Sequence, residues 1–320
     1  MVKKNKAMTN IMKAITTACM TFLFACLLIS CKKQNESSSL AVNLTPEKST
    51  PEIKAKPLPK EFNAYWYAGE AEISSYKLEQ ARYGELREGT AALIYVTEDF
   101  LTNPQVKANR KSDKSVSVLK LNATKKFNTG IYPYSVFQST FYPVANNQHA
   151  IKVSSSMQEW CGHVYTQLNN REQFEVTSHS YFEGEADQNF RLDKAILENE
   201  LWTQLRINPK SLPTGDLSIV PSLEYSRYGH IPIKAYKGNA TLSEGMYTLS
   251  YPELNRILSI TFNPNFPFDI LGWEETFKSG FGAKAKVLTT KATRLKRIKS
   301  PYWQKNTNAD ESLRQTLELD

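Results

Sequence analysis

The sequence ISSYKLEQARYGELREGTAALIYV, residues 73–96, decides the expected fold. Its last six residues, from Ala91 to Val96, form an apolar run with the length and composition of a buried strand. The segment from Ile73 to Tyr83 precedes this run, and Gly84 and Gly89 lie between the two. Two strand patterns with glycines between them are typical of a β-hairpin.

Further strand patterns follow this hairpin along the chain. They cover residues 115–121, 132–142, 150–155, 164–168 and 174–182, with Pro, Asn or Gly between them. No helical periodicity separates these runs. Because parallel neighbours need a long crossover, strands at such short spacing are expected to pair antiparallel, as a meander.

One helix interrupts the series. Asp193 is its expected N-cap, and Asn208-Pro209 its expected end. The apolar residues at helical spacing are Ile196, Leu197, Leu201 and Leu205. Strand patterns return at residues 217–225, 231–242, 246–251, 257–262 and 285–293. The sequence therefore predicts a mainly β fold: one domain over residues 61–305, with a large curved antiparallel sheet, an open or incomplete barrel, and one main helix packed on it.

The first 30 residues have the layout of a secretory signal. Four lysines and no acid are followed by AITTACMTFLFACLLIS, residues 14–30. Leu28-Ile29-Ser30-Cys31 resembles the bacterial lipobox, in which the cysteine is diacylated and the chain is cut before it. The alternative is a transmembrane anchor, since these 17 residues reach the lower limit of a span. The polar KKQNESSS after Cys31 favours a lipoprotein, and two acyl chains would anchor it stably to a membrane.

A polar, proline-containing linker is expected over residues 31–60, and a tail or short helix over residues 306–320. Lys32 follows the lipidated cysteine in place of the aspartate that retains some proteobacterial lipoproteins in the inner membrane. The expected location is therefore the cell envelope, lipid-anchored, at the outer membrane of a Gram-negative bacterium.

Charge and cysteine usage limit the partners. Removal of the four signal lysines lowers the net charge from +8 to 8 − 4 = +4, so we expect no nucleic-acid binding. One dense basic cluster remains, a solvated face or a surface near anionic lipid: Lys291, Arg294, Lys296, Arg297 and Lys299. With Cys19 and Cys26 removed and Cys31 acylated, Cys161 is the one free thiol. It forms no intramolecular disulfide, and in an oxidising envelope we expect it to be buried.

Three long segments resemble a family of Bacteroidota envelope proteins. They are WYAGEAEISSYKLEQARYGELREGTAALIYVTEDF, VSVLKLNATKKFNTGIYPYS and QEWCGHVYTQLNNREQFEVTSHSYFEGEADQ. Members of this family are commonly labelled "septum formation inhibitor Maf", and the resemblance implies no established activity. The phosphate loop of true Maf nucleotide pyrophosphatases, Ser-x-Ser-Pro-Arg-Arg, is not in the sequence, and neither is a Gly-rich phosphate loop. Nucleotide hydrolysis is therefore not expected.

Cys161 and His163 are the weak catalytic candidates. Their spacing puts both side chains on one face of a strand, where an imidazole could activate a thiol. The ordinary alternative is a core cysteine beside Trp160 and Val164.

His163, His179 and Glu183 are the weak candidates for a metal site. Tyr181, Glu185 and Asp187 extend the same strand pattern, and zinc accepts nitrogen and oxygen ligands of this kind. The sequence has no His-Glu-x-x-His motif, and the ordinary alternative is exposed polar residues on a half-solvated strand.

The segment NPNFPFDILGW, residues 263–273, is the candidate for ligand binding, through Phe266, Phe268 and Trp273. Its prolines and its lack of alternation predict a loop, either folded back over the core or exposed as a recognition patch.

These observations favour a non-catalytic binding module for a lipid, a glycan or a protein partner, tethered to the membrane through Cys31 and using no cofactor. The alternative is an envelope hydrolase that uses Cys161 and His163, or a metal at His163 and His179. The substitutions Cys161→Ser and His163→Ala would distinguish the two, because only a catalytic pair should lose its activity outright.

Overall fold

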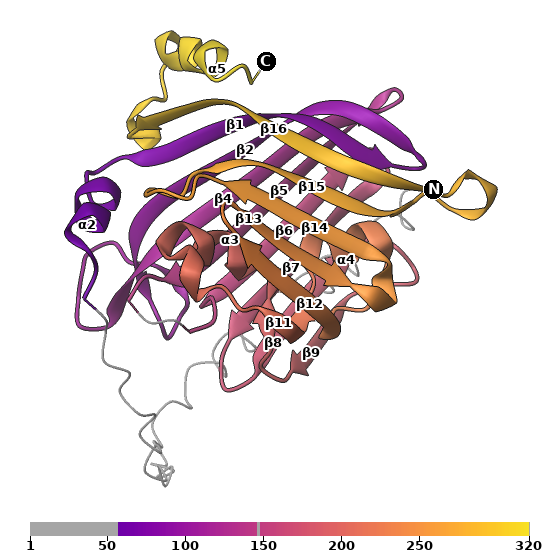
Figure 1. Ribbon diagram of the computed structural model, residues 1–320, viewed down its shortest axis with the longest axis horizontal. Helices are drawn as coiled ribbons and strands as arrows, with labels where there is room; N and C mark the ends of the chain where they lie inside the picture. The colour runs from indigo at the N-terminus through magenta and orange to yellow at the C-terminus, as the bar shows by residue number, and fades with distance from the viewer. Residues whose placement is uncertain (1–56, 146–147, 320) are drawn as a thin grey trace, which may run out of the picture. The chain divides into compact units, whose positions relative to one another are not determined.

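The computed structural model describes residues 57–145 and 148–319 (Figure 1). The expected signal peptide, Cys31 and nearly all of the linker lie outside these residues. Residues 53–320 form one compact unit, whose described part is built on a single sheet of 16 strands. The strands are β1 (Ala71–Arg82), β2 (Glu85–Leu101), β3 (Val106–Lys107), β4 (Ser115–Thr129), β5 (Tyr132–Pro143), β6 (Lys152–Glu159), β7 (Gly162–Asn170), β8 (Phe174–Ser180), β9 (Gln188–Leu192), β10 (Ile196–Leu197), β11 (Gly215–Val220), β12 (Tyr236–Ser243), β13 (Met246–Tyr251), β14 (Arg256–Phe262), β15 (Ile270–Ser279) and β16 (Lys286–Ser300).

The sheet consists of two meanders joined at β1. Its order is β10-β11-β12-β13-β14-β15-β16-β1-β2-β4-β5-β6-β7-β8-β9, with β3 added beside β2. Every pair is antiparallel except β10 with β11. The strands at the two ends, β9 and β10, are not paired with each other, so the sheet is open. The predicted fold class is thus confirmed.

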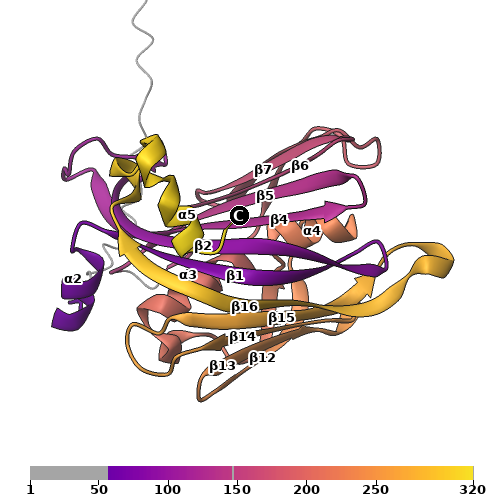
Figure 2. The same ribbon diagram turned by 90° about the horizontal axis from the view of Figure 1, so that it is seen from above.

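The sheet is strongly bent. Long strands twist, and the pairings of β1 with β16 and of β14 with β15 both carry an irregular register, at Ser75/Tyr76 and at Thr261/Phe262. Figure 2 shows β4 to β7 on one side and β12 to β16 on the other, with α3 (Glu198–Ile207) and α4 (Leu223–Gly229) between them. The concave face of the sheet therefore surrounds both helices.

Helix α3 is the main packing element of the concave face. Leu201 and Leu205 lie in one core cluster with Leu93, Leu121 and Leu258, which come from both halves of the sheet. Burial of this kind contributes about 1.5–3 kcal/mol for each large aliphatic side chain.

The start of α3 differs from the prediction. Ile196 and Leu197 form strand β10, and the helix begins at Glu198. Asp193 does not cap it, because its carboxylate accepts a hydrogen bond from Gln173 instead. Glu200 performs a capping role from inside the helix, where its side chain accepts from the Leu197 amide at 3.1 Å.

Helix α4 was not expected. The sequence pattern predicted one strand over residues 217–225, but β11 ends at Val220 and α4 begins at Leu223. Ser222 caps the helix, and its hydroxyl accepts a hydrogen bond from the Tyr225 amide at 3.1 Å.

Two further helices lie at the periphery. Helix α2 (Lys60–Trp66) buries Phe62 and Trp66 in the main core. Helix α5 (Ser312–Thr316) lies in the predicted tail, and Leu317 after it packs on Ala71, Ile73 and Val96. Short 3₁₀ turns occur at Pro209–Ser211, Pro252–Leu254, Gly282–Lys284, Tyr302–Gln304 and Asn308–Glu311. Within residues 57–145 and 148–319, no helix has both the length and the apolar character needed to cross a bilayer.

Candidate functional site

The concave face carries charged groups in an apolar core. Glu72 of β1 is fully buried, and Arg206 of α3 meets it in a two-pronged ion pair, with Nη1–Oε1 at 2.6 Å and Nη2–Oε2 at 2.8 Å. Burial opposes the ionisation of Glu72, but the charge and hydrogen bonds of Arg206 outweigh it and hold the pKa of this carboxyl below its ordinary value.

A second buried ion pair joins the other half of the sheet to α3. Arg256 of β14 donates from Nη2 to Glu198 Oε1 at 2.7 Å and from Nε to Glu275 Oε1 at 2.6 Å. Tyr251 donates a further hydrogen bond to Glu198 at 2.6 Å. Each charge in this group has a partner, which is the condition for burying it without a large penalty.

A small cavity lies between this group and α4. Its volume is about 50 Å³. A water molecule needs roughly 10–15 Å³ on this measure, so the cavity has room for a few waters and not for an acyl chain. Its walls are Leu93, Leu121, Ala123, Lys125, Gln138, Thr140, Glu198, Asn199, Trp202, Ser222, Glu224, Arg256, Leu258, Trp273 and Glu275.

Glu224 is a buried carboxyl group of this cavity with two side-chain donors. Lys125 donates to it at 2.6 Å and Gln138 at 2.7 Å. Burial raises the pKa of Glu224 above its ordinary value, and the charge of Lys125 offsets only part of that effect.

The predicted ligand-binding aromatic residues are divided between two places. Trp273 belongs to β15 and lies at the cavity, 5.3 Å from the ring of Trp202. Phe266 and Phe268 lie in the preceding loop, half-buried, and Phe266 packs on Tyr65 of α2 at 5.6 Å. Of the two arrangements considered for this segment, the structure has the one folded back on the core.

A larger pocket opens at the end of β1, where Arg82 is the last residue of the strand. Its volume is about 280 Å³. Its walls come from β1, α4 and the β15–β16 hairpin: Arg82, Tyr225, Tyr228, Gly229, Phe277, Lys278, Ser279, Gly280, Phe281, Gly282 and Ala285.

Arg82 is buried, yet it forms no ion pair with any carboxylate of the described residues. Its guanidinium donates to the Tyr228 carbonyl at 3.1 Å and to the hydroxyls of Tyr83 and Tyr134 at 3.1 and 3.3 Å. The rings of the same three tyrosines surround it at 4.2–5.4 Å. In the described part of the chain, Arg82 Nε and the Tyr228 hydroxyl have no hydrogen-bond partner.

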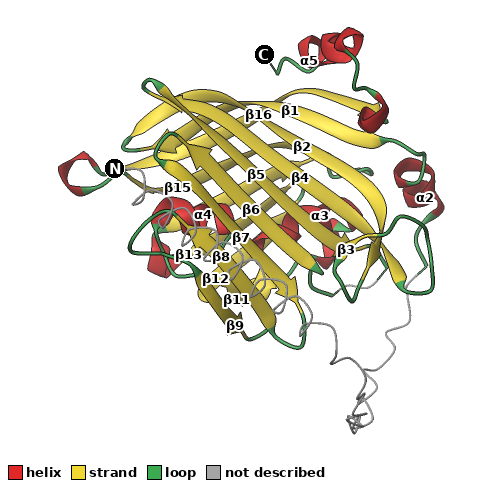
Figure 3. Ribbon diagram, turned by 180° about the vertical axis from the view of Figure 1, so that it is seen from behind, coloured by secondary structure: helices red, strands yellow, loops and turns green. Residues whose placement is uncertain are grey.

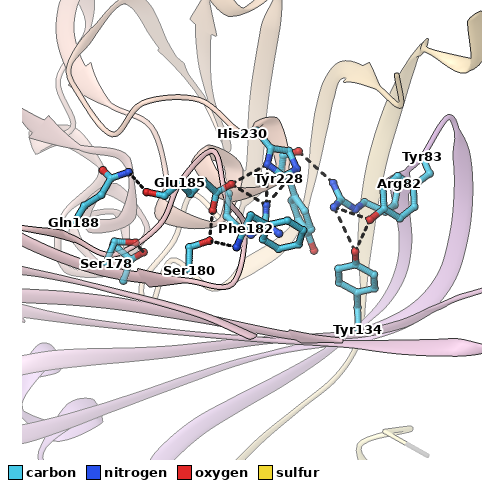
Figure 4. A network of polar contacts seen from close by, with 12 residues as sticks. Arg82, Tyr83, Tyr134, Ser178, Ser180, Phe182, Glu185, Gln188, Tyr228 and His230 are labelled. Carbon is cyan, nitrogen blue, oxygen red and sulfur yellow. Dashed lines mark hydrogen bonds and ion pairs between the residues drawn. The ribbon is translucent and has the colours of Figure 1, made fainter. Parts of the chain in front are cut away.

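A second polar group lies beside this pocket (Figure 4). Glu185 accepts from Arg227 at 3.1 Å and contacts His230 Nδ1 at 2.8 Å, and Arg227 covers the ring of Phe182 at 4.0 Å. Burial and then the charge of Arg227 lower the pKa of His230 below its ordinary value, and Glu185 offsets part of this. Here the acid and the arginine neutralise each other, so Glu185 is not available to Arg82.

Cys161 and His163 do not form a catalytic arrangement. Cys161 lies in the tight turn between β6 and β7 and is exposed. The expectation of a buried thiol was therefore wrong, because a two-residue turn at the end of a hairpin offers too few neighbours to cover the side chain. Its amide donates to Glu159 at 2.7 Å, and the hydrogen bond and charge of this carboxylate raise the pKa of the thiol. A nucleophilic cysteine needs the opposite shift, and no hydrogen bond joins the described Cys161 and His163.

The metal candidates lie apart. His179 of β8 lies opposite Tyr165 of β7, which is two residues beyond His163, so the two histidines are not cross-strand neighbours. Its imidazole instead meets Asp187 at 3.3 Å, with both side chains exposed. Glu183 is exposed in the loop after β8. Among the residues that the structure describes, no three His, Cys, Asp or Glu side chains are placed to hold one metal ion.

Sequence reasoning missed Arg82, Tyr228 and His230. One signal for Arg82 was present: from Tyr76 through Leu78 to Arg82 the alternation of β1 places a charge on the core side. Tyr228 belongs to the helix that was not expected and His230 directly follows it, so their pattern carried no such signal.

Comparisons with known proteins do not assign a function to this chain. No protein-family model matches the sequence, and no curated protein matches it. The crystal structure of a porin-like protein from Bacteroides uniformis is similar over 76% of this chain and 99% of that chain, with 10% sequence identity and a TM-score of 0.21. A likeness at that TM-score supports no inference about this protein. The resemblance to the Bacteroidota envelope family stays a prediction from the sequence.

Proposed function

We propose that this protein is an envelope lipoprotein, anchored through an acylated Cys31, and a non-catalytic binding module whose ligand carries an anionic group that binds beside Arg82. The observation that supports this is a buried arginine without a carboxylate partner at the wall of an open pocket of about 280 Å³.

Burial of an unpaired charge is costly, typically several kcal/mol, unless another group compensates for it. Three neutral tyrosines compensate in part, because their rings and hydroxyls interact favourably with a cation. A phosphate or carboxylate would complete the site, since guanidinium binds either group through two parallel hydrogen bonds. Arg82 Nε and the Tyr228 hydroxyl are buried donors that have no hydrogen-bond partner among the described residues.

The volumes of the inner cavity and of the outer pocket limit the class of ligand that fits. The inner cavity of about 50 Å³ has no room for an acyl chain, so the module does not enclose a lipid there. The outer pocket has room for a phosphate or a carboxylate together with the few atoms next to it. Among the lipid, glycan and protein ligands expected from the sequence, those with a phosphate or a carboxylate fit best.

The experiment compares anion binding by two arginine variants of residues 53–320. Isothermal titration calorimetry is done with inorganic phosphate and with a short-chain, monomeric phosphatidic acid. Arg82→Met should weaken binding at least tenfold, whereas Arg191→Met, at an exposed arginine paired with Glu175, should leave it unchanged.

Near-ultraviolet circular dichroism of both variants checks that they are folded. Binding by the folded Arg82→Met protein at the original affinity, or no binding of either probe by the original protein, would refute the proposal. Native mass spectrometry of the chain purified from its own envelope would then identify the natural ligand.

A further inference from the structure

The hairpin turns at one end of the sheet form a common edge. They are residues 83–84, 130–131, 160–161, the loop 181–187 and residues 280–285, and we call this edge the hairpin rim. The pairings Gly89↔Phe127 and Ser135↔Gln158 bring the first three turns to the same end of neighbouring strands, each displaced by two positions from the one before. In Figure 3 the β15–β16 hairpin lies at the opposite end of the sheet from α2 and β3.

The hairpin rim concentrates exposed apolar side chains. Among the described residues, six large apolar side chains are more than half exposed. Four belong to the rim, Ile131 (84%), Trp160 (69%), Tyr181 (66%) and Phe281 (62%), and the other two, Val287 (69%) and Leu86 (51%), lie two residues from it in the strands. Single exposed apolar residues are ordinary on any protein surface. Their collection at one end, from five separate hairpins, is not, and it marks an interaction surface.

The two ends of the rim differ in charge: the loop 181–187 carries Glu183, Glu185 and Asp187, of which Glu185 pairs with Arg227 and Asp187 with His179, whereas the β15–β16 hairpin is basic. The basic end selects the partner. Lys284 and Lys286 follow the tip residue Phe281, Lys278 precedes it, and none of the three forms an ion pair with a described carboxylate. From Thr276 to Ala309 the sequence contains no Asp or Glu. Exposed lysines beside aromatic and aliphatic tips match a surface that is negative outside and apolar beneath, which describes an anionic bilayer.

The shape of the rim agrees with that partner. Phe281 stands between Gly280 and Gly282, both with positive φ, at the tip of its hairpin. Ile131 and Trp160 are at the tips of two other hairpins. A deformable lipid surface accepts side chains arranged in this way, and Trp and Tyr are enriched at the depth of lipid headgroups.

We propose that the hairpin rim docks on an anionic lipid surface. Ile131, Trp160 and Phe281 enter the headgroup region, and Lys284 and Lys286 lie against the lipid phosphates. Since Phe281 also lines the Arg82 pocket, the docked protein presents this pocket to the headgroups. The docking rests on the rim side chains alone, and only that last consequence rests on the proposed function.

The test is co-sedimentation of residues 53–320 with vesicles of phosphatidylcholine, with and without phosphatidylglycerol. The original protein should sediment with the anionic vesicles, and less so as salt increases. The pair Ile131→Ser/Trp160→Ser should weaken this binding at least tenfold, and Lys284→Gln/Lys286→Gln should remove most of the preference for phosphatidylglycerol.

The matched control is Phe137→Ser/Tyr165→Ser, which removes two exposed aromatic residues from β5 and β7 away from the turns and should leave sedimentation unchanged. Brominated phosphatidylglycerol should quench tryptophan emission, and Trp160→Phe should remove that quenching. Sedimentation that is absent, or that the control pair and the rim pairs reduce equally, would overturn the proposal.

The two proposals can fail separately. Inorganic phosphate binding is measured by calorimetry on Ile131→Ser/Trp160→Ser, whose substituted residues do not line the Arg82 pocket. Phosphate binding without vesicle binding by the original protein refutes the docking alone. Vesicle binding without phosphate binding refutes the anion pocket alone.

Discussion

The positive charges of two buried arginines of the concave face, Arg206 and Arg82, are stabilised in different ways. Arg206 has a carboxylate on two of its nitrogens, and its Nε donates to the Pro267 carbonyl at 3.1 Å. The rings of Trp66 and Tyr95 cover its guanidinium at 5.0 and 4.6 Å. Arg82 has tyrosine rings as well, but no carboxylate among the described residues. The first site is closed and holds the fold together, whereas the second has buried donors without a partner among the described residues and lies at the wall of a pocket.

Removal of one partner at the closed site should have the strongest effect on stability. Glu72→Gln leaves the charge of Arg206 buried without a counter-ion, so the free energy of unfolding should fall by about 3–5 kcal/mol. Urea denaturation measures it. The double variant Glu72→Leu/Arg206→Met should recover most of the loss, because an apolar pair needs no counter-ion. A loss of less than about 1 kcal/mol for Glu72→Gln would contradict this account of the ion pair.

Truncation at the open site should cost less. Arg82→Met removes hydrogen bonds and ring contacts but leaves no buried carboxylate unpaired, so the loss should be on the order of 1–2 kcal/mol. Saturating phosphate should stabilise the original protein and not the variant, which differential scanning calorimetry would detect as a shift in Tm. If Arg82→Met costs as much as Glu72→Gln, then Arg82 is a structural residue like Arg206.

The Lys125–Glu224 pair is intermediate between the closed and the open arginine site. It predicts that the free energy of unfolding depends on pH. Because burial raises the pKa of Glu224 above 4.5, the folded state binds more protons than the unfolded state between 4.5 and the raised value. The free energy of unfolding should therefore fall as pH rises through that window. Urea denaturation at several pH values should show this slope, and Glu224→Gln should remove it. Glu274→Gln, at a half-exposed glutamate paired with Lys291, is the control that should keep the slope.

His230 should give the weakest effect, with the opposite sign. Its pKa is lowered below 6.5, so the unfolded state binds more protons between the lowered value and 6.5. Stability should therefore rise with pH in that window. His230→Asn should flatten this part of the stability profile, whereas His179→Asn, at an exposed histidine, should not. An unchanged profile in His230→Asn would assign the pH dependence to other groups.

Local patterns were sufficient for the fold class. The hairpin of β1 and β2 and the meander that follows use neighbouring strands, whose pairing is evident from turns and alternation. The pairing of β1 with β16 joins Ala71 to Ser300 and leaves no trace in either segment. The apolar run at residues 217–225 has the length of a strand, and only tertiary packing divides it into β11 and α4.

The site was much less predictable than the fold. Arg82, Tyr134 and Tyr228 come from β1, β5 and α4, with sequence separations of 52 and 146 residues in their hydrogen bonds to Arg82. No local pattern reports that three tyrosines surround one arginine. Cys161 and His163 attracted attention because rare residues are close in sequence, yet a turn and the face of a strand hold both of them in solvent.

The pairing of the first strand with the last one also sets the order in which the chain can complete its core. β16 begins 286 − 82 = 204 positions after β1 ends. At about 5–20 residues per second, synthesis leaves one side of β1 without its neighbour for roughly 10–40 seconds. An unpaired strand edge invites association with other chains, and a charge within the strand opposes it. Lys77, the one side chain of β1 in the exposed class, puts such a charge in this strand.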